Sequence, residues 1–177
     1  MSDYLISGSC HCLSVKFTLE SDHIYPFNIC YCSICRKTAG GGGYAINLSG
    51  KYQTLKVEGR EYLRVYQGRI VDPETQEIKI SPAQRHFCGN CGSHLWLWDP
   101  RWPDLVHPLA SAIDTELPVP PERTHIMLDF KPSWVEVNFG EKDKKFPRRP
   151  NESIAKWHER LGLVGDRHIV ESTHDLR

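Results

Sequence analysis

The sequence predicts a mainly β, largely antiparallel domain that ends in one helix. Short segments in which apolar and polar residues alternate recur along the chain, and residues 14–19 (SVKFTL) are a clear example. Clusters of turn-forming residues separate these segments. Helical periodicity is convincing in one place, close to the C-terminus. The chain of 177 residues has room for one such domain with a hydrophobic core.

The predicted strands follow one another with mostly short connections. From the N-terminus, we expect them at residues 14–19, 44–48, 54–57, 61–66, 84–87, 94–98, 126–130 and 134–137. Residues 69–82 include Asp72, Pro73 and Pro82, so a loop or a short hairpin is expected there. Both faces of the strand at residues 94–98 are apolar, which is typical of a strand covered on both sides.

The helix is predicted between Asn151, as its N-cap, and Gly162, which is suited to end it. Glu152 is expected in its first turn. Apolar residues recur there at steps of three and four positions, at Ile154, Trp157 and Leu161. The residues after about 165 are polar and unpatterned, and we expect a loose tail. We therefore expect a β domain at residues 1–140, followed by a linker, an amphipathic helix and a tail at residues 141–177.

The charge balance argues against a nucleic-acid partner. Lysine plus arginine total 22 and aspartate plus glutamate total 22, so the formal net charge is zero. Phosphate neutralisation needs a basic surplus or a basic stripe, whereas the short basic cluster at residues 142–149 reads as a solvated linker. The N-terminus lacks the features of an export signal, and no apolar run is long enough to cross a membrane. We therefore expect a cytoplasmic protein with no membrane contact, whose thiols stay reduced.

The seven cysteines favour metal binding over disulfides. An odd number in a chain that is not secreted fits a disulfide framework poorly, and the two thiolates of a Cys-x-Cys pair can face one metal ion. The cysteines form three groups along the chain: Cys10 and Cys12; Cys30, Cys32 and Cys35; Cys88 and Cys91. We read them as zinc ligands.

The strongest local signal is Cys88-Gly-Asn-Cys91-Gly between two predicted strands. Both sulfurs of such a turn point to one side, and Gly92 permits the backbone conformation that closes it. The alternative is a redox dithiol, which usually lies at a strand-to-helix junction. The following residues, SHLWLW, indicate a strand instead. Zinc is the better interpretation.

Two cysteines cannot complete a tetrahedral zinc site, so Cys88 and Cys91 need partners from elsewhere. Giving Cys30, Cys32 and Cys35 an ion of their own leaves Cys10 and Cys12 to complete a four-thiolate site. In the alternative division, Cys88 and Cys91 form a closed site with part of the triplet, and the N-terminal pair is left without a metal ion. The first division predicts one closed, structural zinc and one zinc with a free position for chemistry. Two zinc ions per chain are therefore expected.

Residues after the triplet could bind a ligand of the open zinc. Arg36 and Lys37 are cations beside three thiolates, and Gly41 and Gly42 leave room for a ligand at the backbone. Solvated cations and a simple turn are the alternative. His11 and His94 are adjacent to cysteine motifs, but the cysteines suffice as ligands, so we expect structural or surface roles for both.

Three motifs together resemble the glutathione-dependent formaldehyde-activating enzyme family, which also contains the centromere protein V domain. They are GSCHC at residues 8–12, CYCSICRKTAGGG at residues 30–42 and FCGNCGSHL at residues 87–95. HIMLDFKPSW, at residues 125–134, looks like the family's closing strand motif. The resemblance covers roughly residues 5–137. Tyr31 stands where many relatives have histidine, and the C-terminal helix lies outside the shared core.

The resemblance implies a β-tent fold, in which antiparallel sheets converge on a structural zinc. It further implies that Cys10, Cys12, Cys88 and Cys91 bind that zinc, whereas Cys30, Cys32 and Cys35 hold the catalytic one. Founding members are described as joining formaldehyde to glutathione to give S-hydroxymethylglutathione.

The functional hypothesis is a zinc-dependent carbon–sulfur lyase that acts on an adduct between a glutathione-like thiol and formaldehyde or another small electrophile. Arg36 and Lys37 could then receive the carboxylates of the thiol substrate. The alternative is a zinc-stabilised module without catalysis, either a thiol carrier or a protein-interaction domain. A redox sensor based on the triplet is a third hypothesis. Assembly into a homodimer is left open.

Overall fold

Twelve strands and two α-helices make up the regular structure of the computed structural model, which describes residues 4–39, 41–72 and 74–165. The strands are β1 Tyr4–Ser9, β2 Lys16–Ser21, β3 Asn28–Cys30, β4 Ala45–Ile46, β5 Gly50–Lys51, β6 Lys56–Glu58, β7 Leu63–Val71, β8 Ile78–Cys88, β9 His94–Trp98, β10 Leu105–Pro108, β11 Thr124–Ile126 and β12 Lys144–Lys145. The helices are α1 Ser33–Thr38 and α2 Ile154–Leu161. The predicted mainly β fold with a C-terminal helix is confirmed.

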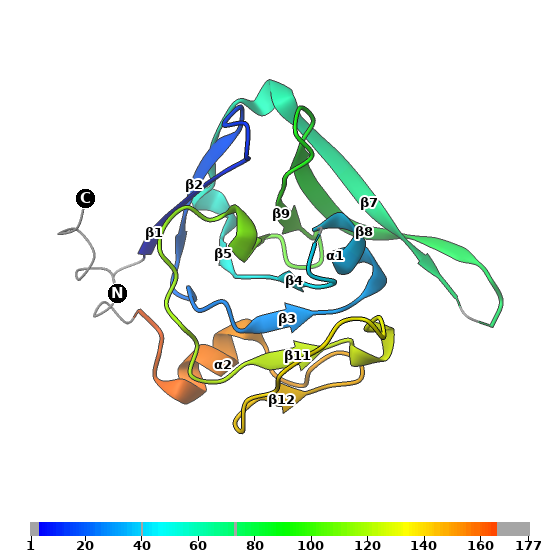
Figure 1. The fold of residues 1–177 in the computed structure, drawn as a ribbon. Coiled ribbons are helices and arrows are strands. Elements are labelled where there is room, and N and C mark those ends of the chain that lie inside the picture. The colour runs from blue at the N-terminus through cyan, green and yellow to red at the C-terminus, as the bar shows by residue number, and fades with distance from the viewer. Residues whose placement is uncertain (1–3, 40, 73, 166–177) are drawn as a thin grey trace.

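The strands form three sheets that lean together like the sides of a tent. Their orders are β1-β2-β6, β5-β10-β9-β8-β7 and β12-β11-β3-β4. Figure 1 shows the first two sheets sloping toward one another at the top and the third running across the base. The first two sheets are antiparallel throughout, whereas β11 pairs in parallel with both β3 and β12. The third sheet is therefore mixed.

The first sheet contains a strand that the alternation did not predict. The predicted strand at residues 14–19 corresponds to β2, and its partner β1 pairs with it along its whole length, from Tyr4 opposite Ser21 to Ser9 opposite Lys16. Gly8 weakens the strand signal of β1. A Cβ at this position would lie 2.3 Å from the carbonyl oxygen of Ala112, so glycine is required by close packing.

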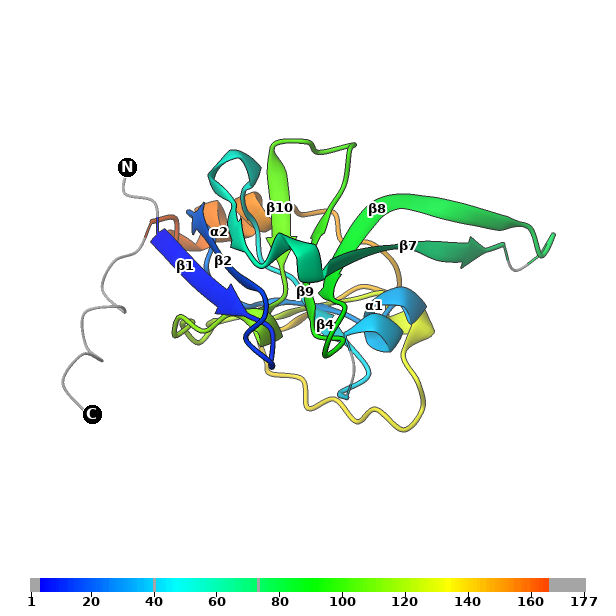
Figure 2. The same ribbon diagram turned by 90° about the horizontal axis from the view of Figure 1, so that it is seen from above.

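The second sheet extends into a long hairpin, which corrects the prediction for residues 69–82. β7 continues to Val71 and β8 begins at Ile78, so most of this region is strand. Figure 2 shows the hairpin projecting beyond the rest of the molecule. Pro82 lies inside β8 because the register shifts between Gln67 and Arg69, and a proline is tolerated at such an irregularity.

Other predicted strands are shorter or absent. Residues 44–48 contain the two-residue β4, and residues 54–57 and 61–66 each begin within a 3-10 turn before β6 or β7 starts. The expected strand at residues 126–130 ends early, because Met127 has a positive φ of 61° and a 3-10 turn, Leu128–Phe130, follows. Residues 134–137 form no strand. Val135 is buried there, but the segment does not pair with a neighbouring strand.

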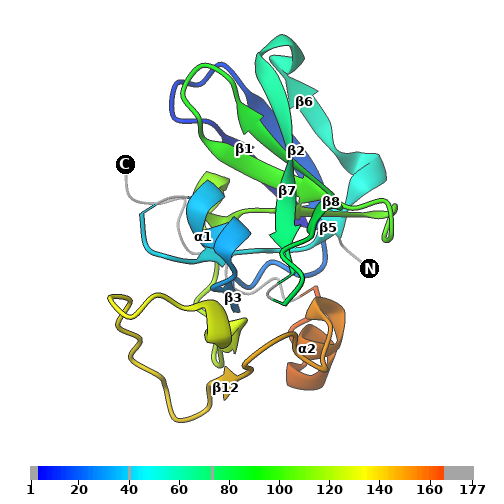
Figure 3. The same cartoon turned by 90° about the vertical axis from the view of Figure 1, so that its right-hand side faces the viewer.

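The core joins the first two sheets to α2. Phe17 of β2 contacts Trp96 of β9 edge-to-face, with 5.1 Å between ring centroids. Trp157 of α2 is fully buried and stacks on Phe27 at 3.8 Å. Burial of the Trp157 and Phe27 side chains stabilises the docked helix, and each side chain contributes about 1.5–3 kcal/mol. Figure 3 shows α2 beside β12 at the base, and α1 above β3 on the side of the upper sheets.

The helix α2 begins slightly later than predicted. Ser153, rather than Asn151, is the N-cap, and its side chain accepts a hydrogen bond from the backbone N–H of Lys156. Glu152 therefore precedes the helix. Gly162 ends it in the left-handed conformation, with φ of 68°, as predicted.

The predicted division at residue 140 stays a prediction, although α2 packs into the core. The expected loose tail falls mainly on residues 166–177, which lie outside the described residues. None of the helices in the described part of the chain has the length and apolarity needed to cross a bilayer.

His158 gives the docking of α2 a pH dependence. It is fully buried, its Nδ1 lies 2.8 Å from the carbonyl oxygen of Ile154, and its Nε2 accepts from the backbone N–H of Tyr25 at 3.3 Å. These bonds require the neutral imidazole with its proton on Nδ1. Burial lowers the pKa of His158 from 6.5 to about 4. The unfolded chain therefore binds this proton more tightly than the folded chain does.

We expect the free energy of unfolding to be unaffected by this group above about pH 6.5 and to fall as the pH is lowered toward 4, by about 2–3 kcal/mol in total. Urea unfolding of wild type and His158→Gln at several pH values measures the difference. Protonation of the cysteines is common to both proteins and cancels. An identical pH dependence in both would contradict the prediction.

Candidate metal centre

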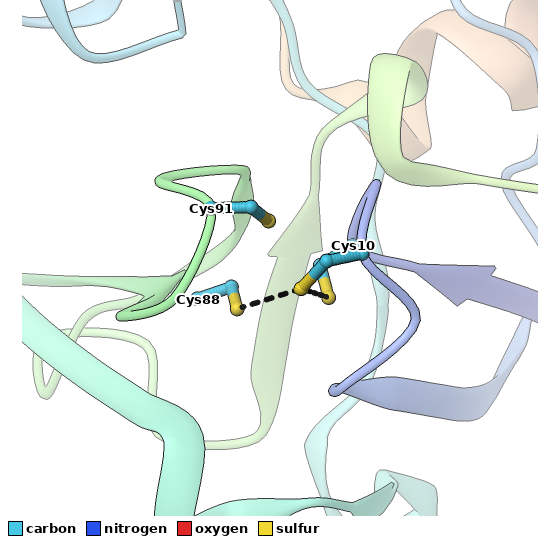
Figure 4. Close-up of side chains that lie close together, drawn as sticks. Cys10, Cys88 and Cys91 are labelled. Atoms are coloured by element: carbon cyan, nitrogen blue, oxygen red, sulfur yellow. Dashed lines mark hydrogen bonds between the residues drawn. The ribbon is translucent and has the colours of Figure 1, made fainter.

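Four cysteine sulfurs meet where the first two sheets converge. Cys10 and Cys12 lie in the connection from β1 to β2, whereas Cys88 ends β8 and Cys91 lies in the turn to β9. The four Sγ atoms all lie within 4.8 Å of one another. Figure 4 shows Cys10 facing Cys88 and Cys91 from the opposite loop. The distance from Cys12 Sγ to Cys88 Sγ, 76 positions apart in sequence, is 3.8 Å.

Backbone groups shape each half of this four-sulfur cluster. The N–H of Val15 donates to Cys10 Sγ at 3.2 Å, a bond that favours the thiolate. The N–H of Gly92 donates to the carbonyl of Cys88 at 2.8 Å, and Gly92 has a φ of 75° that favours glycine. The two turns therefore present their sulfurs through local geometry, as the Cys88-Gly-Asn-Cys91-Gly motif predicts.

Hydrogen bonds also join the two turns to each other. The backbone N–H of His11 donates to Ser93 Oγ at 3.1 Å, and the side-chain amide of Asn90 donates to Ser14 Oγ at 3.2 Å. Cys10 and Cys88 are buried, whereas Cys12 and Cys91 are exposed at the surface. His11 contributes its backbone here, and its exposed ring is not among the groups in the cluster.

The other three sulfurs form a separate triplet at the start of α1. Cys30 ends β3, Cys32 is the N-cap of α1 and Cys35 lies in its first turn. Their Sγ atoms also lie within 4.8 Å of one another. A Cβ on Gly68 of β7 would lie 2.7 Å from Ile34 of α1, so the absence of a side chain lets this short helix pack directly against the second sheet.

The three thiols of the triplet lie so close together that one of them has a lowered pKa and another a raised pKa. Hydrogen bonds from Cys30 and Cys35 lower the pKa of Cys32, and its Sγ also accepts from the backbone N–H of Cys35 at 3.3 Å. The same contacts, together with burial, raise the pKa of Cys30. The first proton therefore leaves the triplet easily and the remaining protons do not, unless a cation is bound.

Arg85 is a site residue that the motifs did not reveal. It lies on β8 with 6% of its surface exposed, and its Nη2 donates to Cys35 Sγ at 3.9 Å. The sequence carried one usable signal, because Ser81, Ala83 and Arg85 alternate on the inward face of β8. A charged residue at a buried strand position is uncommon and marks a place where a partner is needed.

Two adjoining hollows border the residues that follow α1. One, of about 350 Å³, is lined by Gly41, Gly42 and Tyr44 among others, and the second, of about 460 Å³, includes His94. Ala39 and Ser111 line both, and we call the two adjoining hollows the groove; among the cysteines, Cys10 lines it and the triplet does not. These volumes are in the range of small-molecule sites. A third hollow of about 480 Å³ on the first sheet contains no cysteine.

The predicted ligand-binding residues are only partly brought together. Gly41 and Gly42 line the groove, whereas Arg36 and Lys37 are not among its lining residues. Arg36 is half-buried and Lys37 is exposed, both on α1 directly after Cys35. His94 is buried, and neither of its ring nitrogens has a hydrogen-bond partner among the described residues.

The donor sets fit soft divalent metal ions. All seven cysteines are free thiols, and they are grouped four and three, in the division that the spacing favours. Thiolate sets of this kind suit zinc, whose closed sites use four ligands and whose open sites use three. The alternative division, in which a closed site takes sulfurs from the triplet, does not match this grouping.

Three comparisons with known proteins found similar sequences or structures. Residues 5–129 match the model of a protein family described as glutathione-dependent formaldehyde-activating enzyme. A relative from Halomonas elongata, provisionally named as a glutathione-dependent formaldehyde-activating enzyme, is 61% identical over 159 residues, which are 90% of this chain and 98% of the relative. A crystal structure of a Rhodobacter sphaeroides protein has 24% identity and a TM-score of 0.48, and the match covers 63% of this chain and 91% of that one. The matched family region contains both cysteine groups, and α2 lies outside it.

Substitution in the four-sulfur cluster should unfold the protein more readily than substitution in the triplet. Cys88 has no exposed surface and joins β8 to the first sheet through the cluster. We expect Cys88→Ser to lower the free energy of unfolding by more than about 4 kcal/mol if the four-sulfur cluster holds a metal ion, because it would remove a ligand that links two distant segments. Denaturant unfolding, with Lys79→Ala at an exposed position of the same strand as a control, tests this. Equal stability of Cys88→Ser and wild type would contradict the prediction.

Proposed function

Because the chain belongs to the glutathione-dependent formaldehyde-activating enzyme family, we propose that it is a zinc-dependent carbon–sulfur lyase. Its substrate is an adduct between a glutathione-like thiol and formaldehyde or another small electrophile. The proposal covers both directions of the reaction, adduct formation and adduct cleavage.

The inequality of the two sulfur clusters is the observation that carries this proposal. The cluster between the sheets offers four sulfurs, whereas the triplet offers three and no other cysteine lies with them. In the proposal, Cys10, Cys12, Cys88 and Cys91 hold a structural zinc, and Cys30, Cys32 and Cys35 hold a catalytic one. A three-ligand site keeps one position free, which is the usual arrangement of a catalytic zinc.

When bound at the triplet, zinc would supply a means of lowering the pKa of an incoming thiol. The residues of the chain have other tasks. Gly41 and Gly42 leave the groove open for the thiol substrate, and Arg36 and Lys37 offer cations for its carboxylates. In the forward direction the substrate sulfur attacks the carbonyl carbon, a C–S bond forms, and the C=O π electrons move to oxygen, which takes a proton. Cleavage reverses these changes.

The cellular setting in this proposal is the reducing cytoplasm. All seven cysteines are unpaired thiols, and a reducing compartment keeps them available as metal ligands. The partner is a small thiol rather than a nucleic acid, in keeping with the zero net charge. Homodimer formation is compatible with this reaction and is not required by it.

Elemental analysis of freshly purified protein should find two zinc ions per chain. The expected count follows from two separated sulfur groups, which cannot share one ion at tetrahedral bond lengths. Cys88→Ser and Cys32→Ser should each lose one ion. A wild-type protein with one zinc ion would leave the proposed reaction without a site.

Cys32→Ser should lose catalysis and keep the fold. Cys32 is partly exposed at the N-cap of α1, so serine can retain the cap. We expect adduct formation from glutathione and formaldehyde, followed by NMR, to slow by more than about 100-fold, because losing a metal ligand costs at least as much as losing the groups that orient one. The free energy of unfolding should change by less than about 1 kcal/mol.

Ser33→Ala, on an exposed neighbour, is the matched control and should keep full activity. Calorimetry with glutathione distinguishes the alternatives. Binding by the wild type without rate acceleration would indicate a thiol carrier, and no binding would indicate a protein-interaction module. Either result would overturn the lyase proposal.

A further inference from the structure

The guanidinium of Arg85 is buried beside the triplet with one hydrogen-bond partner. Its Nη2 donates to Cys35 Sγ at 3.9 Å, whereas Nε and Nη1 are buried and make no hydrogen bond within the described part of the chain. No carboxylate of the described residues forms an ion pair with it. Arg160, by contrast, forms ion pairs with Glu122 and Glu152.

A buried cation in this position needs a negative charge nearby. Arginine cannot be deprotonated in proteins, and a buried charge without a partner costs several kcal/mol. A neutral thiol is a weak acceptor and offsets little of that cost. The Cys35 sulfur satisfies Arg85 well only when the triplet carries negative charge, as thiolates that bind a metal do.

The net charges of the two metal-loaded clusters show why the triplet needs a buried cation and the four-sulfur cluster does not. A divalent ion with three thiolates carries a charge of −1, and Arg85 brings the buried site to zero. The four-sulfur cluster would carry −2, but Cys12 and Cys91 are exposed and water can screen the charge. A fourth, anionic ligand at the triplet adds one more negative charge in a buried place, and there a fixed cation matters most.

Arg36 and Lys37 follow Cys35 on α1, and the other titratable groups of the second sheet near the triplet, His86 and His94, add no cation. His94 and His86 both have a lowered pKa, mainly because of burial, and the charge of Arg85 contributes to the shift at His94. Both rings therefore stay neutral near pH 7. The positive charge packed against Cys35 from the second sheet is that of Arg85.

We propose that Arg85 is the counter-cation of the triplet site and that it makes the site prefer an anionic fourth ligand, a thiolate, over a neutral one. This inference rests on the proposed function, because it assumes that a metal ion at the triplet accepts a thiol substrate. Arg85 acts through Cys35 and the local field, so it is a positioning residue rather than a catalytic one.

The test compares wild type with Arg85→Met, Arg85→Lys and Arg69→Met. The last is the matched control, an exposed arginine on the adjacent strand β7. Zinc-loaded proteins are titrated by calorimetry with glutathione, which binds as a thiolate, and with imidazole, a neutral ligand. Zinc affinity is measured in parallel by competition with a chelator.

We expect Arg85→Met to weaken glutathione binding by about 10- to 100-fold, as the loss of one unit charge near a buried anion implies. Imidazole binding should change less than threefold. Arg85→Lys should restore most of the glutathione affinity, and Arg69→Met should behave as wild type. Zinc should bind the triplet of Arg85→Met more weakly as well, because three thiolates then lack their counter-charge.

Stability without the triplet metal separates this role from a structural one, and the Cys32→Ser background supplies that state with the fold kept. In this background, adding Arg85→Met should leave stability unchanged or raise it, since it removes a buried charge that lacks a partner. Equal loss of stability with and without metal, or equal weakening of glutathione and imidazole binding, would overturn the inference. So would unchanged glutathione binding in Arg85→Met. A wild type with one zinc ion, or one that does not bind glutathione, would instead overturn the proposed function and this inference together.

Discussion

The convergence of four cysteine sulfurs at the top of the tent is the constraint on which the rest of the structure depends. Cys12 and Cys88 are 76 positions apart, and their sulfurs lie 3.8 Å from each other. The first two sheets share an apolar core in which Phe17 contacts Trp96, and the sulfur cluster joins their turns at the edge of that core. The hydrogen bond from the backbone of His11 to Ser93 and the one from Asn90 to Ser14 align the same two turns. The space between the sheets is set by this junction.

The triplet lies against the second sheet because of how α1 is held. Gly68 lets Ile34 pack against the backbone of β7, and Cys35 then faces Arg85 on the neighbouring strand. Two sites built from the same donor atom therefore have different electrostatic surroundings. The four-sulfur cluster has two exposed cysteines that water can screen, whereas the triplet has two buried cysteines, one partly exposed one and a buried cation beside Cys35. The affinity for a metal ion and the preference for an added fourth ligand can thus differ between the two clusters, although both use cysteine sulfur as the donor atom.

At the base, the C-terminal helix closes the core from outside the matched family region. Trp157 stacks on Phe27, and His158 connects α2 to the backbone of Tyr25. Tyr25 and Phe27 lie directly before β3, the strand that ends in Cys30. The helix therefore supports the segment that carries the triplet, and Tyr31 is held in turn by a hydrogen bond of 2.9 Å to His125. Contacts on both sides of Cys30 restrict how it can move.

Local patterns determined the β class, the helix end at Gly162 and the cysteine motifs that supply the two sulfur groups, because each depends on a few neighbouring residues whose period or spacing is visible in the sequence. The burial of Arg85 beside Cys35, 50 positions away, was not visible, since no local period reports which strands become neighbours. For the same reason β1 was missed and a strand was wrongly expected at residues 134–137. Ladder partners and close approaches such as that of Gly8 to Ala112 are fixed only when distant segments pack, and tertiary structure alone decided them.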